Sequence, residues 1–176
     1  ERAERELAKS EEALLFLEDL FQAATPAEAQ YFGRNKVQFD AFDFQELDTD
    51  HFRILYYPPE EQAVRDAARM AERWYERHSQ VFLHTFEERK PLVLYANDAD
   101  FQQTNVIDRR ISPATGGFTE PRLERVVMPL SASYGETHHV LGHELVHSFQ
   151  YDLALSGGRG FQLRAVPLWL VEGMAE

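Results

Sequence analysis

The chain has 176 residues with an apolar fraction of 44%, which suits one domain, or one with a small appendage, and argues against disorder. Its formal net charge of −12 argues against a nucleic-acid partner, and no apolar run is long enough to span a bilayer. The absence of cysteine excludes disulfides and thiolate ligands, which leaves histidine and carboxylate as strong zinc ligands.

The first stretch of the chain has the spacing of an amphipathic helix. Apolar residues recur every three or four positions across residues 1–24, with charged residues on the other faces, and Pro26 ends the pattern. Three heptads are marginal as an isolated helix, so we expect residues 1–26 to be a packed appendage or a short arm. Residues 36–176 should form the main domain.

Two strands and a long helix are expected next. Residues 37–44 alternate partly between polar and apolar, and residues 51–57 form a second strand, so the two could pair as a hairpin. Residues 60–86 have helical spacing, with a buried stripe of Val64, Ala67, Ala71, Trp74, His78, Val81 and Phe82. We interpret His51 and His78 as structural histidines, since each fits a packed position.

The following segments alternate between strand and loop. Residues 91–95 are a short apolar strand that should be central in a sheet. A polar loop over residues 105–121 leads to a strand over residues 122–130. Because Pro129 cannot donate a hydrogen bond to a neighbouring strand, we expect this strand to lie at a sheet edge or to end there.

The next helix contains a metal-binding pattern. Ser133 begins a capping box, and the helix should run from there to about Leu155. Within it, His-Glu-x-x-His places His143 and His147 one turn apart on one face, where both imidazoles can bind one metal ion. Glu144 lies beside them, where a carboxylate can take a proton from metal-bound water.

A third ligand is available near the end of the sequence. Glu172 lies in an otherwise apolar segment that begins near Pro167, and a buried carboxylate is unfavourable unless it is paired or binds a metal. Glu176, one turn later, could hydrogen-bond a ligand histidine. The alternative is a solvated glutamate near a helix start. We favour the ligand, because two histidines and one glutamate form a recurrent catalytic zinc site.

These segments together resemble the gluzincin metallopeptidases, the group that includes thermolysin and aminopeptidase N. In that group, a second helix after His-Glu-x-x-His supplies a glutamate ligand, and residues 169–175 are similar to its W-x-x-E-G-x-A segment. The resemblance implies one zinc ion held by His143, His147 and Glu172, with Glu144 as general base. Glu176 would match an outer acid of the thermolysin-like enzymes.

The same resemblance implies hydrolysis of peptide bonds. A peptide or protein substrate would add as an extended strand to an edge formed by Arg125, Val126, Val127 and Met128. The Gly116–Gly117 loop would flank the cleft. The order of the expected elements indicates an α+β fold, in which a small mixed sheet packs on the metal-binding helix.

The sequence ends at Glu176, before the tyrosine or histidine that such enzymes usually place beyond the third ligand. We therefore expect further domains after Glu176 in the native protein, and weak zinc binding and hydrolysis by these residues alone. A start without Met fits a removed export signal and a periplasmic or secreted location.

Two other functions share parts of this pattern. One is a catalytically inactive gluzincin-like interaction or structural module of a larger protein, and the intact Glu144 argues against it. The other is peptide deformylase, which shares His-Glu-x-x-His but takes its third ligand from cysteine, and this chain has none.

Overall fold

A computed structural model describes residues 40–58, 60–107, 111–112, 114–131, 133–156, 163 and 166–176 of the chain. All of these residues belong to the unit Gln38–Glu176. The helix expected over residues 1–26 lies outside the described residues.

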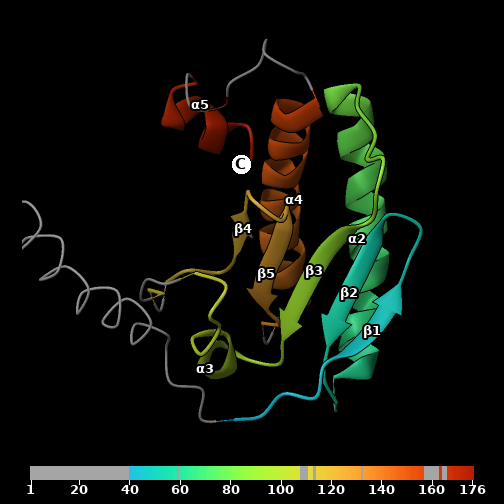
Figure 1. Ribbon diagram of the computed structural model, residues 1–176, viewed down its shortest axis with the longest axis vertical. Coiled ribbons are helices and arrows are strands. Elements are labelled where there is room, and N and C mark those ends of the chain that lie inside the picture. Colours follow the sequence, from blue (N-terminus) through green and yellow to red (C-terminus); the bar gives the residue numbers. More distant parts are fainter. Residues whose placement is uncertain are drawn as a thin grey trace, which may run out of the picture. The chain divides into compact units, whose positions relative to one another are not determined.

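The described residues form an α+β fold with a five-stranded mixed sheet (Figure 1). The strands in chain order are β1 (Gln45–Asp48), β2 (Phe52–Tyr56), β3 (Lys90–Tyr95), β4 (Phe118–Glu120) and β5 (Arg125–Pro129). Their order in the sheet is β1-β2-β3-β5-β4. Strands β2, β3 and β5 are parallel, whereas β1 and β4 pair antiparallel with their neighbours and form the two edges. The apolar strand β3 is therefore central, as its sequence predicts.

The helices of the described residues are α2 (Glu61–Phe82), α3 (Asp98–Phe101), α4 (Tyr134–Ser156) and α5 (Leu168–Gly173). Helix α2 connects the parallel strands β2 and β3, which need a crossover of this kind. Helices α2 and α4 pack against each other behind the sheet (Figure 1). Within the described part of the chain, none of the helices has the length and apolar character needed to cross a membrane.

Each face of the sheet has its own apolar core. Successive side chains of a strand point to opposite faces, so Leu94 and Met128 pack with α2 and α4, whereas Val93 and Val127 pack on the other side with Phe101 of α3. Because both faces are covered, β3 and β5 are apolar after their first residues, Lys90 and Arg125. The mixed sheet packed on the helix with the histidine pattern confirms the α+β prediction at this level.

Most predicted elements are confirmed, with several differences, one of which is that α2 ends at Phe82 rather than near residue 86. Strand β1 lies at Gln45–Asp48 rather than over residues 37–44, because its register is set by pairing with β2, where Asp48 lies opposite Arg53. Strand β4 falls inside the predicted polar loop. Val81 is exposed instead of buried, since it lies in the last turn of α2 and borders a cavity rather than the core.

A close contact between α2 and α4 depends on a glycine. A Cβ atom built on Gly142 would lie 2.6 Å from Cε2 of Trp74, closer than nonbonded atoms approach. The Trp74 indole also donates a hydrogen bond of 3.0 Å to the His138 carbonyl, and His78 Nε2 lies 3.1 Å from the Gly142 carbonyl oxygen. His78 also stacks on the Trp74 ring at 5.0 Å, so the indole is held by a hydrogen bond and by a stacked ring and cannot easily move away.

We expect Gly142→Ala to destabilise the protein by about 1–3 kcal/mol, the usual cost of overpacking a filled core. Alanine favours a helix more than glycine does, so this loss would occur despite better helix propensity. Urea unfolding would measure it. Gly135→Ala is the matched control in α4, where the nearest atom is 3.6 Å from the built Cβ and stability should stay equal or rise by up to about 1 kcal/mol. Equal stability of Gly142→Ala and the wild type would contradict the packing argument.

Candidate metal centre

Helix α4 carries an unusual number of buried polar side chains. The helix begins as predicted, with the Glu136 amide donating a hydrogen bond of 3.1 Å to Ser133 Oγ. It then packs on β4 and β5 of the sheet and against α2, which lies beside it on the same face. Its buried polar residues are Thr137, Glu144, His147, Ser148, Gln150 and Asp152. Because buried polar groups need partners, this helix is where a functional site is to be sought.

Three potential ligands from two helices meet beside α4. The Nε2 atoms of His143 and His147 are 3.2 Å apart. Glu172 Oε2, from α5, lies 3.5 Å from His143 Nε2 and 3.4 Å from His147 Nε2. These three residues are the group within the described residues whose ligand atoms could hold one metal ion. The structure therefore brings together the three residues that the sequence predicted as ligands.

These separations fit zinc. Two ligand atoms that are each about 2.0–2.1 Å from a tetrahedral ion are about 3.3–3.4 Å apart. The three observed separations, from 3.2 to 3.5 Å, bracket that value. Two neutral imidazoles and one carboxylate also match the donor set of catalytic zinc sites that keep a fourth position open.

Glu144 is buried next to the three candidate ligands without being one of them. Its side chain is 6% exposed, and Thr119 Oγ1 of β4 lies 2.7 Å from Glu144 Oε2 and 2.9 Å from the Glu144 carbonyl oxygen. Burial raises the pKa of the Glu144 carboxyl, and the hydrogen bond from Thr119 and the nearby histidines oppose this rise. Gly117 lies against the same side chain, since a Cβ there would be 3.2 Å from Glu144 Cγ.

Helix α5 differs from the prediction in its burial. We expected its apolar residues to pack inside, but Leu168 and Trp169 are 71% and 74% exposed. The helix is short, and its buried residue is Val171, followed by the buried Ala175 just after the helix. The Glu172 side chain is therefore about half exposed (49%) rather than buried, and its position next to two histidines, not its burial, makes it a candidate ligand.

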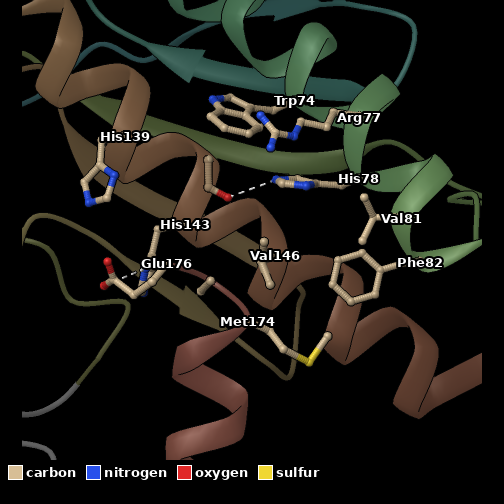
Figure 2. A pocket seen from close by; sticks show the side chains of 12 residues that line it. Trp74, Arg77, His78, Val81, Phe82, His139, His143, Val146, Met174 and Glu176 are labelled. Atoms are coloured by element: carbon tan, nitrogen blue, oxygen red, sulfur yellow. Dashed lines mark hydrogen bonds and ion pairs between the residues drawn. The ribbon is translucent and has the colours of Figure 1, made fainter.

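Glu176 and a cavity lie on the other side of His143. Glu176 Oε1 is 3.8 Å from His143 Nδ1, which is an ion-pair distance and too long for a hydrogen bond. Figure 2 shows both residues at the border of a cavity of about 290 Å³ between α2, α4 and the last residues of the chain. The other side chains that line it include Trp74, Arg77, His78, Val81, Phe82, His139, Val146 and Met174.

Gln150 and Thr119 contact the site and were not predicted from the sequence. Gln150 Oε1 lies 2.9 Å from His147 Nδ1, and Gln150 Nε2 donates a hydrogen bond of 3.0 Å to the carbonyl oxygen of Val171. An amide three residues after a candidate ligand histidine, on the same side of the helix, is a signal in the sequence that could have identified Gln150. Thr119 lies in a loop-like stretch of sequence, and only the pairing of β4 brings it to Glu144.

Two other histidines, His51 and His78, have structural roles, as predicted. His51 Nδ1 is 2.7 Å from Glu72 Oε2, and its ring stacks on Tyr75 at 3.6 Å. His78 is buried, and burial lowers its pKa despite its hydrogen bond to Gly142. His139 is exposed at the cavity and is not part of the ligand group.

Buried ion pairs hold the C-terminal half of α4. Asp152 accepts hydrogen bonds from Lys90 of β3 and, at 2.5 Å, from His84 Nε2. Glu124 also pairs with Lys90. Burial alone would raise the pKa of Asp152, but its partners outweigh burial and lower the pKa. The helix that carries His143 is therefore tied to the sheet near its end.

The predicted substrate-binding edge is wrong. Strand β5, with Arg125, Val126, Val127 and Met128, pairs with β3 on one side and β4 on the other. Within the described sheet, Val126 and Val127 are paired on both sides, so the middle of β5 offers no free edge to a substrate strand. Of the two expectations for Pro129, the second holds, since β5 ends there. The edge next to α4 is β4 (Phe118–Glu120), which pairs with β5 alone in the described sheet.

Comparison of this chain with protein-family models, with curated proteins and with solved structures gives no match. The resemblance to the gluzincins therefore stays a hypothesis, which rests on the two sequence segments and on the position of their side chains.

Proposed function

We propose that this chain is a zinc-dependent metallopeptidase of gluzincin type. The observation that supports this proposal is the group of His143 Nε2, His147 Nε2 and Glu172 Oε2, whose separations of 3.2 to 3.5 Å fit one tetrahedral ion. These residues would hold the zinc. When bound, zinc would polarise the scissile carbonyl and lower the pKa of its coordinated water to about 7.

Glu144 would act as the general base. It is buried, it lies directly after a ligand histidine, and Thr119 holds its carboxylate at 2.7 Å. In this position it would accept a proton from the attacking water as the oxygen–carbon bond forms. It would then donate that proton to the amine nitrogen as the carbon–nitrogen bond breaks.

The substrate would be an extended peptide on strand β4. This strand forms the sheet edge nearest α4, and its middle residue, Thr119, contacts the proposed base. An extended segment can pair with such an edge through main-chain hydrogen bonds. The proposal thus moves the substrate from β5, as predicted from the sequence, to β4.

A second candidate is a metal-stabilised interaction module without catalysis. The exposed apolar side chains of Leu168, Trp169 and Met174 favour it, because such residues cluster where another protein surface binds. The buried Glu144 argues against it, since a purely structural zinc site has no use for a carboxylate beside its ligands.

Metal removal and reconstitution test the proposed function. The purified full-length protein should bind one zinc ion per molecule by elemental analysis, and it should cleave peptides from a defined peptide mixture as followed by mass spectrometry. A chelator should abolish cleavage, and added zinc should restore it. Stoichiometric zinc without cleavage would support the interaction module. Cleavage that survives complete metal removal would reject both candidates.

A further inference from the structure

Gln150 is a buried amide that connects the two helices of the proposed zinc site. It lies in α4, is 4% exposed and contacts a ligand histidine at one end and the backbone of α5 at the other. His147 and Val171 are each 8% exposed, so water has little access to either contact. All three groups therefore depend on one another for their hydrogen bonds.

The backbone carbonyl of Val171 determines which way the amide points. A carbonyl oxygen only accepts hydrogen bonds, so the atom 3.0 Å from it must be the NH₂ group of Gln150. The amide oxygen then faces His147 Nδ1 at 2.9 Å. This oxygen also only accepts, so Nδ1 must carry the hydrogen.

The tautomer of His147 follows from this chain of hydrogen bonds. A neutral imidazole with its hydrogen on Nδ1 has a lone pair on Nε2. His147 Nε2 is the atom that lies 3.4 Å from Glu172 Oε2 and 3.2 Å from His143 Nε2. The lone pair is therefore on the atom that faces the other two proposed ligands.

The same amide places the third ligand. Its bond to Val171 joins α4 to the residue directly before Glu172, in a helix of six residues that buries few side chains. Short helices depend on tertiary contacts for their position. By contrast, His143 Nδ1 has Glu176 at 3.8 Å, which is beyond hydrogen-bond distance.

We propose that Gln150 is a positioning residue of the zinc site, which presets the donor atom of His147 and holds α5 so that Glu172 faces it. This inference rests on the proposed function. It applies to the chain without metal as well, because neither hydrogen bond involves the proposed ion.

Two substitutions distinguish the hydrogen bond to His147 from the hydrogen bond to Val171. Gln150→Met has similar volume and removes both hydrogen bonds. Gln150→Glu can accept from His147 Nδ1 but cannot donate to the Val171 carbonyl as a carboxylate. The matched control is Gln62→Met, at an exposed position of α2. Circular dichroism and thermal unfolding would verify that each variant is folded, and Gln150→Glu is the variant to use if Gln150→Met does not fold.

The first readouts need no metal. In zinc-free wild type, the ¹⁵N shifts of His147 should show the hydrogen on Nδ1. Gln150→Met should lose this preference and exchange the α5 amide hydrogens faster, whereas Gln150→Glu should keep the tautomer but also exchange α5 faster. Zinc affinity should fall by about 10–100-fold in Gln150→Met, as for other groups that orient a ligand. The Gln62→Met control should match the wild type in all three.

An unchanged tautomer and unchanged α5 exchange in Gln150→Met would overturn the inference. So would a hydrogen on Nε2 in the wild type. Because these measurements are made without zinc, they test the two hydrogen bonds of Gln150 separately from the metal site. Failure of the wild type to bind zinc would reject the proposed function, and the tautomer and exchange measurements would still decide whether Gln150 holds His147 and α5.

Discussion

Replacing Glu172 by alanine is expected to lower the zinc affinity of this chain by more than about 100-fold, since losing even a group that orients a ligand costs about 10–100-fold. Glu172 Oε2 lies 3.5 and 3.4 Å from the Nε2 atoms of His143 and His147, and it is the anionic member of the group. Its removal would leave two neutral imidazoles, which hold a divalent ion less well. Competition with a fluorescent zinc chelator, at one fixed pH, would measure the change.

The control for this substitution is Glu76→Ala, which removes an exposed carboxylate from α2 and changes the net charge by the same amount. Because the Glu172 side chain is half exposed, its loss should change the stability of the zinc-free chain by less than about 0.5 kcal/mol. A lower affinity can then be attributed to the site and not to unfolding. Wild-type affinity in Glu172→Ala would reject this residue as a ligand.

Glu144→Gln should remove peptide hydrolysis while zinc binding and the fold remain. Loss of a general base typically lowers turnover by about 10²–10⁴-fold. Glutamine has nearly the same shape, and its amide oxygen can still accept the hydrogen bond that Thr119 Oγ1 makes at 2.7 Å. It cannot accept a proton at neutral pH, so only the chemical step should fail.

Turnover of a peptide substrate and zinc stoichiometry should be measured on the same preparations of wild type, Glu144→Gln and the surface control Glu76→Gln. The expected pattern is equal zinc in all three and loss of turnover in Glu144→Gln alone. Near wild-type turnover in Glu144→Gln would reject the role assigned to this carboxylate. A loss of zinc in the same variant would show that Glu144 supports the site structurally.

The features that the sequence predicts well are those that depend on neighbouring positions. The spacing of four residues between His143 and His147 places both on one helix face, whatever the helix packs against. The capping residue Ser133 and the apolar strand over residues 91–95 are local signals of the same kind, and all three are confirmed.

The prediction from sequence failed for the pairing between distant strands. Pro129 indicates an edge strand or a strand end, and nothing local decides between them. The structure ends β5 at Pro129 and covers its edge with β4, a strand of three residues that has too few positions to show alternation. For this reason, the proposed substrate-binding edge is β4 and not β5.

The types of the proposed ligands and their order along the chain follow from the sequence alone, because helix geometry and the absence of cysteine leave few other ways to hold the proposed zinc. Tertiary structure decided the rest. It brought half-exposed Glu172 to the histidines across a stretch of 24 intervening residues (172 − 147 − 1), and it placed Thr119 and Gln150 against them. Such contacts depend on how α5 and β4 pack on α4, and packing is a property of the whole fold, which no local spacing encodes.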